Sequence, residues 1–332
     1  MTIERAKKVA DERTLTTVVI PNYNGIEYLK NCLDSLLKGT NVPEIIVVDN
    51  GSLDGSRELV TAEYPKVRLI TFAENRGFDA AVNAGIKAAD TEYVFLLNND
   101  TVVAENCVEE LEKAMENADR CFSVGAKMIN MKFPGKIDDA GDFYCALGWA
   151  FARGKDKDVS GYQKPGRIFA ACAGAAVYRR ELFETVGYFD EEHFAYLEDI
   201  DIGYRANILG YRSEYAPKAV VYHAGSGFSG SRHNPFKVDL TARNSIYLIY
   251  KNMPVLQMIL NLPFLLLGYL IKFLFFLKKG MGKVYLKGIA KGFRLSFSER
   301  GRKNKVKFKA KNLPHYLYIQ WELWAGMVRR II

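Results

Sequence analysis

The chain has 332 residues, 49% of them hydrophobic and 25% charged, which is ordinary globular composition and excludes a low-complexity chain. The net charge of +8 is unevenly spread. Residues 243–332 carry 18 basic residues against two acidic ones, whereas residues 1–242 carry 28 basic against 36 acidic ones. This split points to two parts with different partners, a cation for the acidic part and an anionic surface for the basic part.

Residues 1–14 form a charged leader without the apolar core of a secretory signal. We therefore expect the folded part to stay in the cytoplasm. The five cysteines are scattered and form no CxxC pair. They are expected to be small buried side chains in a reducing compartment rather than zinc ligands.

The first part of the chain alternates β-branched runs with segments of helical periodicity. Strands are predicted over residues 17–20, 44–48, 67–72 and 93–97, and helices over residues 26–37, 55–64, 78–89 and 101–118. Four such repeats with short connections predict a Rossmann-like α/β domain with a mostly parallel central sheet and helices on both faces.

Residues 121–173 are irregular and Gly-rich, and we expect a loop-dominated substrate-binding region there. After this region the pattern predicts strands over residues 174–178 and 213–222, and helices over residues 180–186 and 195–209. The α/β domain is accordingly placed at residues 15–242.

Polar side chains follow each of the four predicted strands. They are Asn22, Asn24, Asp49, Asn50, Ser52, Asn75, Arg76, Asn98, Asn99 and Asp100. Each group alone would be explained by a turn. Because ligands bind beyond the carboxyl ends of the strands in such sheets, the convergence of all four groups predicts a ligand site.

Asp100 ends the run LLNND after the fourth strand, and His223 follows the last strand and precedes a Gly-rich loop. A carboxylate, an amide and a distant imidazole suit Mn²⁺ or Mg²⁺ held mainly by a diphosphate. Such an ion would stabilise the charge on a leaving diphosphate. The alternative for Asp100 is to cap the helix predicted after it.

Glu198, Asp199 and Asp201 crowd three carboxylates into the start of a predicted helix. Acids there favour the helix dipole and would then be caps. Their mutual repulsion should also raise a pKa, which suits a general base. Arg205 either pairs with Asp201 across one turn or binds a phosphate.

Seven short segments between residues 18 and 226 carry a further pattern. They read VVIPNYNG (18–25), IVVDNGSLDG (46–55), ENRGF (74–78), FLLNND (95–100), RRELFETVGYFDE (179–191), YLEDID (196–201) and YHAGS (222–226). In this order and spacing the chain resembles the family-2 inverting glycosyltransferases with the A-type fold, and within them the rhamnosyltransferase-like branch. The likeness covers nearly two-thirds of the chain.

The resemblance implies a nucleotide-sugar site at the first strand ends. Pro21, Asn22 and Tyr23 would line the nucleotide site. Asp49 would hydrogen-bond the pyrimidine, Asn50 and Ser52 would shape its pocket, and Arg76 would lie near the base or ribose.

The resemblance also implies the reacting groups. Asn99 and Asp100 would stand at the family's metal-binding acid motif, with Asp100 on the ion and His223 completing its shell. Asp199, beside Glu198, would be the base that deprotonates the acceptor hydroxyl, and Arg205 could approach the diphosphate. A single displacement would invert the anomeric centre.

Three functions stay open at this point. The branch favours dTDP-rhamnose as donor, but UDP-galactofuranose and other UDP-sugars fit as well, because residues 79–83 depart from the family pattern. Asn98 and Asn99 stand where relatives often carry acids, which keeps a non-catalytic nucleotide-sugar-binding protein as an alternative. A nucleotidyltransferase is disfavoured because no early Gly-rich phosphate loop is present.

Residues 243–332 are predicted to form a helical membrane-association region. Residues 256–276 are apolar and near the length of about 20 residues that spans a bilayer, and an amphipathic basic stretch at 283–294 and a polybasic run at 300–311 follow. Because both flanks are basic, a monotopic or re-entrant anchor on the cytoplasmic face is favoured over a span, with homodimerisation as a further alternative. Such an anchor fits a polyprenyl-diphosphate-linked glycan acceptor and an anionic membrane surface, and the aromatic content argues against nucleic acid.

Overall fold

The computed structural model describes residues 14–225 and 234–331, so the predicted leader lies outside the described residues apart from Thr14. The strands of its main sheet are β1 (Thr16–Asn22), β2 (Glu44–Asp49), β3 (Arg68–Thr71), β4 (Tyr93–Leu97), β5 (Thr101–Val103), β6 (Cys121–Asn130), β7 (Ile137–Asp139), β10 (Gly166–Ile168), β11 (Ala175–Arg179) and β12 (Arg212–His223). The order along the sheet is β10-β12-β6-β11-β4-β1-β2-β3.

The direction of the strands confirms a mostly parallel sheet. β1 pairs in parallel with β2 and β4, β2 with β3, and β12 with β6. β5, β7, β10 and β11 run against their neighbours. The strands predicted up to residue 97 are all present, with ends within two residues of the prediction.

Helices cover both faces of this sheet. α2 (Ile26–Leu37), α3 (Ser56–Glu63) and α5 (Cys107–Glu116) share one buried cluster with Val18 and Ile20 of β1. α4 (Phe78–Ala88) shares the other cluster with Val19, because successive residues of a strand point to opposite faces. The alternation read from the sequence therefore places the core correctly.

The helix predicted over residues 101–118 is wrong at its start. Thr101–Val103 is the strand β5, which pairs with β12 so that Thr101 lies opposite His223, and the helix begins only at Cys107. The β-branched run Thr-Val-Val favours a strand. Asp100 therefore caps no helix, and the register brings it next to His223.

The loop region predicted over residues 121–173 is also wrong. It contains the ten-residue strand β6, the short strands β7 and β10, and a hairpin of β8 (Asp142–Cys145) and β9 (Trp149–Ala152). β6 is buried along almost its whole length, so the alternation of apolar and polar residues that marks a half-exposed strand is missing.

β12 is interrupted by a bulge in its pairing with β6. Ala216 lies opposite Ala126, and the next pair is Val220 with Lys127, so that Pro217, Lys218 and Ala219 have no opposite residue. Proline is tolerated at such positions because the ladder loses no donor there. Beyond the bulge, the strand continues in register to His223.

The two helices predicted over residues 180–186 and 195–209 are shorter in the structure. Residues 180–186 divide into a 3₁₀ turn (Arg180–Leu182) and α6 (Phe183–Val186), and α7 (Glu198–Ile208) begins three residues later than expected. Phe194, Tyr196 and Leu197 instead adopt positive φ angles of 64°, 70° and 68°. These conformations are uncommon for residues with a Cβ atom.

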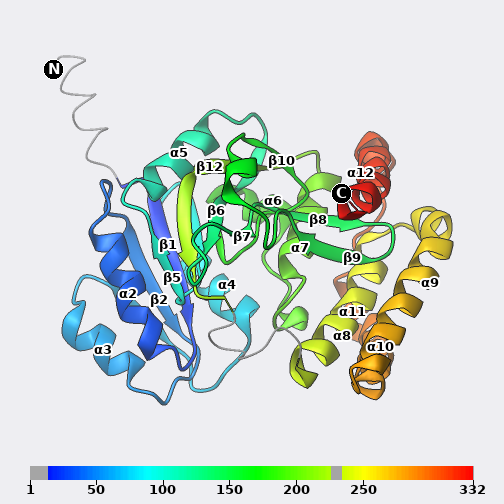
Figure 1. Ribbon diagram of the computed structural model, residues 1–332, viewed down its shortest axis with the longest axis horizontal. Coiled ribbons are helices and arrows are strands. Elements are labelled where there is room, and N and C mark those ends of the chain that lie inside the picture. Colours follow the sequence, from blue (N-terminus) through cyan, green and yellow to red (C-terminus); the bar gives the residue numbers. More distant parts are fainter. Residues whose placement is uncertain (1–13, 226–233, 332) are drawn as a thin grey trace.

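The C-terminal helices gather at the end of the molecule opposite α2 and α3 (Figure 1). They are α8 (Pro235–Asn252), α9 (Val255–Lys278), α10 (Gly282–Phe297), α11 (Glu299–Lys303) and α12 (Leu313–Ile331). The boundary proposed between residues 242 and 243 falls inside α8. α10 lies against α8 at Gly288 and Gly292, where a Cβ atom would come within 2.5 Å of a carbonyl oxygen of α8.

Candidate active site

A cavity of about 820 Å³ opens at the carboxyl ends of β1, β2 and β4 and reaches the start of α7. Most of the site residues predicted from the sequence line it. These are Pro21, Asn22, Tyr23, Asn50, Asn99, Asp100, Glu198, Asp199 and His223. Asp49, Ser52, Arg76 and Arg205 are not among the lining residues.

The strand ends on the nucleotide side are joined by side-chain hydrogen bonds. Asn22 donates to Asp49 and Ser52, both at 3.2 Å, and accepts from the Asn99 amide at 2.7 Å. Asp49 also accepts from the Arg57 guanidinium at 2.6 Å. Burial would raise the pKa of Asp49, but these hydrogen bonds outweigh it and hold the pKa below its usual value. Asp49 is therefore a charged residue that fixes Asn22 from behind the cavity wall.

Asn50 fixes the neighbouring turn. Its amide donates to Asn75 and to the Gly77 carbonyl, and its oxygen accepts from the Arg76 N–H at 2.8 Å. The Arg76 side chain lies over the Phe72 ring, 4.8 Å from its centroid, and is half exposed beside the cavity. The turn that carries Arg76 is thus held rigidly against the end of β2.

Asp100 and His223 face each other across the β5–β12 pairing. The His223 Nε2 atom lies 3.2 Å from Asp100, and its Nδ1 atom lies 2.8 Å from Asp138 of β7. Burial would lower the pKa of His223, but the two carboxylates outweigh it and raise the pKa to about 9.

This donor set fits a divalent cation. A carboxylate oxygen and an imidazole nitrogen converge at the cavity wall, and the second ring nitrogen is oriented by a further carboxylate, as is usual for metal-binding histidines. No sequence motif marks Asp138. Its contact with His223 follows from the β6–β7 pairing, which brings the two side chains together.

Glu198 and Asp199 stand at the first turn of α7. Burial, and then the charge of Asp199, raise the pKa of Glu198 to about 8. Burial also raises the pKa of Asp199, against hydrogen bonds from Asp142 and from the Ile200 N–H at 2.7 Å. These shifts agree with the prediction that an acid in this cluster has a raised pKa. Desolvation by burial raises the pKa values more than repulsion between the carboxylates does.

Asp142 of β8 is a cavity residue that the sequence did not reveal. It is buried, and burial together with its acidic neighbours raises its pKa well above the usual value. Since two carboxyl groups can share a hydrogen bond only when one is protonated, Asp142 is the donor and Asp199 the acceptor. Asp142 therefore opposes the effect of burial on the pKa of Asp199 and favours the charged carboxylate, the state that accepts a proton.

The loop before α7 is held by α8. The Asn244 amide donates to the carbonyls of His193, Ala195 and Tyr196 at 2.8–2.9 Å, and the Arg243 guanidinium to those of Glu192 and His193. Asn244 is fully buried. Its three contacts hold the positive φ angles that aim Glu198 and Asp199 into the cavity.

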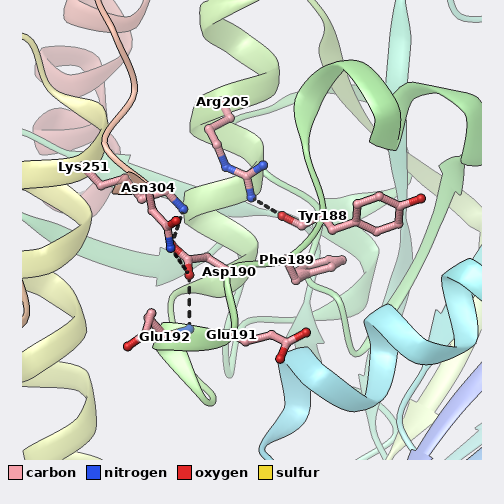
Figure 2. Close-up of a pocket in the computed structure, with 8 residues that line it drawn as sticks. All are labelled: Tyr188, Phe189, Asp190, Glu191, Glu192, Arg205, Lys251 and Asn304. Carbon is pink, nitrogen blue, oxygen red and sulfur yellow. Dashed lines mark hydrogen bonds and ion pairs between the residues drawn. The ribbon is translucent and has the colours of Figure 1, made fainter. Parts of the chain in front are cut away.

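Asp201 and Arg205 lie apart from the cavity. Figure 2 shows Arg205 pointing to the Tyr188 carbonyl in a separate pocket of about 370 Å³, beside Asp190, Lys251 and Asn304. Its guanidinium is bound by Asp201 and by the carbonyls of residues 186–188. Of the two roles considered for Arg205, the structure shows the pair with Asp201.

Sheet and cavity together define the class of α/β transferases that bind their donor at the ends of parallel strands. The profile of glycosyl transferase family 2 matches residues 17–187, slightly more than half of the chain, and the chain belongs to this family. The match ends before α7, so it does not cover Glu198, Asp199 or His223.

Relatives are transferases as well. N-acetylglucosaminyl-diphospho-decaprenol L-rhamnosyltransferase of Mycobacterium tuberculosis is 28% identical over 232 residues, which are 62% of this chain and 75% of that protein. The uncharacterized glycosyltransferase YwdF of Bacillus subtilis is 30% identical over 236 residues, which are 70% of this chain and 81% of that protein.

Solved structures share the fold. The crystal structure of GalNAc-T7 with UDP, GalNAc and Mn²⁺ has a TM-score of 0.58 and 19% identity over 73% of this chain, which spans only 48% of that one. The mannosyltransferase PcManGT from Pyrobaculum calidifontis, in complex with GDP-Man and Mn²⁺, has a TM-score of 0.53 and 17% identity, over 99% of this chain and 93% of its own. The A-type glycosyltransferase fold expected from the motifs is thereby confirmed.

Proposed function

We propose that this glycosyltransferase moves L-rhamnose from dTDP-rhamnose to a polyprenyl-diphosphate-linked saccharide at the cytoplasmic face of the membrane, in cell-surface polysaccharide synthesis. The observation that carries the proposal is the cavity that joins Asn22 and Asn50 to the Asp100–His223 pair and to Glu198–Asp199. The rhamnosyltransferase relative, whose name states a diphospho-decaprenol acceptor, supports the choice of sugar and acceptor.

The donor binds with its nucleotide at the ends of β1 and β2 and its diphosphate toward Asp100. Asp100 and His223 would hold Mn²⁺ or Mg²⁺, and the ion would supply positive charge to the leaving diphosphate. The fold neighbours that contain Mn²⁺ support this choice of ion. Because Asn98 and Asn99 stand in place of acids, the protein would offer such an ion few charged ligands.

Asp199 acts as the base. It takes the proton of the acceptor hydroxyl while that oxygen attacks the anomeric carbon and the bond from carbon to the diphosphate oxygen breaks. Attack and departure occur on opposite sides of the carbon, which inverts its configuration. Glu198, neutral below its pKa of about 8, adds no second charge to the site at pH 7.

α9 supports a membrane-bound acceptor. Among the described residues it is the one helix long and apolar enough to cross a membrane, and most of its large apolar side chains are exposed. With the basic helix α10 beside it, α9 is suited to lie in the membrane surface. In this proposal the acceptor lipid approaches the cavity from the side of α9.

The test is nucleotide release from dTDP-rhamnose and from UDP-sugars, with detergent-solubilised protein, Mn²⁺ or Mg²⁺, and a lipid-diphosphate-linked sugar. We expect metal-dependent release of dTDP, with the rhamnose recovered on the lipid. Release of UDP from UDP-galactofuranose instead would identify that sugar nucleotide as the donor. It is the second candidate, and the fold neighbour that contains UDP supports it. Binding of donors without transfer to any acceptor would contradict the proposal.

A further inference from the structure

A second cavity, of about 1570 Å³, adjoins the active-site cavity. Both are lined by residues 150–152 of β9 and by Asn98, Cys172 and His223. From this shared wall the second cavity extends to the C-terminal half of α9 and to the end of α12. A ligand in it can therefore reach the active site without occupying the nucleotide position, because Asn22 and Asn50 line only the first cavity.

The second cavity is strongly basic. Eight basic side chains line it against two acidic ones, Asp138 and Asp139. Asp138 lies at the end shared with the active site, where it binds His223 and pairs with Lys155. The remainder of the lining therefore carries an excess of positive charge away from the candidate metal ligands.

Six of these cations lie over aromatic rings. Two of them, Arg167 and Arg329, also bind Asn207 and Glu322. For the other four, the distances to the ring centroids are 5.3 Å for Arg153 over Tyr162, 5.6 Å for Lys272 over Trp149, 5.1 Å for Lys279 over Phe275 and 5.9 Å for Arg330 over Phe151. Within residues 14–225 and 234–331 none of the four forms an ion pair with a carboxylate, whereas Lys155 and Arg329 do. Ring contacts orient a cation without neutralising it, which leaves its charge for an anionic ligand.

The wall formed by α9 is apolar and opens outward. Ile271 and Phe275 line the cavity and are also exposed on the surface, at 42% and 44%. The exposed row of apolar side chains on α9 continues from them along the helix. The cavity thus connects a basic interior to an exposed apolar surface along which a hydrocarbon chain would lie.

We propose that this cavity binds the diphosphate of a prenyl-linked acceptor. The prenyl chain then lies along α9, and the sugar extends past the residues shared by the two cavities toward Asp199. The proposal rests on the proposed function for the identity of the sugar, but not for the binding of the lipid diphosphate. Arg153 and Arg330 suit phosphate oxygens because a guanidinium can donate two parallel hydrogen bonds.

Trp149 provides a direct test of binding. The chain has three tryptophans, and the other two, Trp321 and Trp324, lie exposed or partly exposed on α12, so that Trp321→Phe and Trp324→Phe leave Trp149 as the sole emitter. In EDTA, geranylgeranyl diphosphate should change its emission, and geranylgeraniol should not.

Lys272→Gln and Arg330→Gln should each weaken the apparent affinity about tenfold, whereas Lys66→Gln, an exposed control outside the cavity, should not. Equal binding of the alcohol, or unchanged affinity in both variants, would overturn the proposal.

Kinetics separates this proposal from the proposed function. In the same Gln variants, the KM for the lipid-linked acceptor should rise about tenfold, while the KM for the sugar nucleotide stays the same. If the unmodified protein transfers no sugar, the proposed function fails, and the emission titration still decides whether the cavity binds a lipid diphosphate. If transfer occurs with an unaltered acceptor KM in both variants, only the cavity assignment is wrong.

Discussion

Glu198 and Asp199 are adjacent and both half-buried, yet their hydrogen bonds differ. Asp199 receives hydrogen bonds from Asp142 and a backbone N–H, whereas one Glu198 oxygen has no hydrogen-bond partner among the described residues. Burial therefore acts on Glu198 almost unopposed and leaves it neutral at pH 7. The difference supports the proposed base role of Asp199.

Replacing Asp199 tests that assignment. Asp199→Asn should lower kcat by about 10²–10⁴-fold with little change in the donor KM, because the amide accepts no proton. In the unmodified enzyme, the rate should fall as the pH drops through the raised pKa of Asp199, since the protonated acid is inactive as a base. Asp79→Asn is the matched control, because Asp79 is buried outside the cavity and burial raises its pKa well above the usual value. An Asp199→Asn enzyme with full kcat would exclude this residue as the base.

Glu198 should instead affect stability. Its pKa is raised from 4.5 to about 8 in the folded state, so the unfolded chain loses this proton at lower pH and folding is penalised increasingly as the pH rises from 4.5 to 8. Glu198→Gln removes the penalty. We expect its melting temperature to exceed that of the unmodified protein by about 5 °C at pH 8, and by much less at pH 5. A difference that does not grow with pH would contradict the raised pKa.

His223 should bind metal less well without Asp138. Asp138→Asn weakens the orientation of the imidazole, and loss of such a partner costs about 10–100-fold in metal affinity. The expected result is a rise of that size in the Mn²⁺ concentration that gives half-maximal activity, with the rate restored at saturating Mn²⁺. Asp158→Asn, at an exposed turn, serves as control. Equal Mn²⁺ dependence in the Asp138 and Asp158 variants would argue against His223 as a ligand.

At the scale of elements, the loop before α7 depends on a helix more than forty residues away in sequence. Asn244 of α8 binds three of its carbonyls, and α8 is in turn fixed by the close approach of α10 at Gly288 and Gly292. The positive φ angles of residues 194, 196 and 197 have an energetic cost, which these contacts offset. The C-terminal helices thus help to shape the active site as well as any membrane contact.

Asn244→Ala should therefore reduce activity without abolishing the fold. The carbonyls of Ala195 and Tyr196 lose this donor, while that of His193 keeps Arg243, and we expect about 1–3 kcal/mol of lost stability and a reduction in kcat of at least tenfold. Asn261→Ala is the matched control, since Asn261 is equally buried but pairs with Gln320 away from the cavity. It should lower stability to a similar extent and leave kcat unchanged. Equal kcat in the two variants would show that the loop needs no support from α8.

Local patterns predicted the first four strands, because the strands of residues 16–97 are apolar, largely β-branched runs closed by Asn, Asp and Gly. They failed for β5 to β10, where small and polar residues interrupt the apolar runs, and for Asp138, Asp142 and Asn244. These three residues act through partners 48 to 85 positions distant, and no local spacing signals such contacts. Arg205 was ambiguous because an i,i+4 pair and a phosphate ligand use the same residue types.

At the scale of the whole molecule, the charge split of the sequence corresponds to two ends. Four acidic residues of the α/β domain line its cavity, and the basic C-terminal helices with the exposed apolar face of α9 lie at the end opposite α2 and α3 (Figure 1). In the proposed membrane-bound state, this polarity would favour one orientation on an anionic surface.

Membrane binding should depend on α9. Leu266→Gln with Leu270→Gln replaces two exposed apolar side chains, at 62% and 53% exposure, and should release protein from phosphatidylglycerol vesicles in a flotation assay. Each buried side chain contributes about 1.5–3 kcal/mol, so a loss of bound fraction of tenfold or more is expected. Leu53→Gln, an exposed residue of the α/β domain, should have no effect. Undiminished flotation of the α9 variant would assign the membrane contact elsewhere.

The bulge in β12 determines where this chain can change length over evolution. The strand resumes its pairing with β6 at Val220, so residues gained or lost between Ala216 and Val220 alter the bulge and leave His223 next to Asp100. Between Val220 and His223 successive residues point to opposite faces, so one residue more or fewer there would turn the histidine away from Asp100. Related sequences that keep the aspartate–histidine pair should therefore vary in length at the bulge and not in the three residues before the histidine.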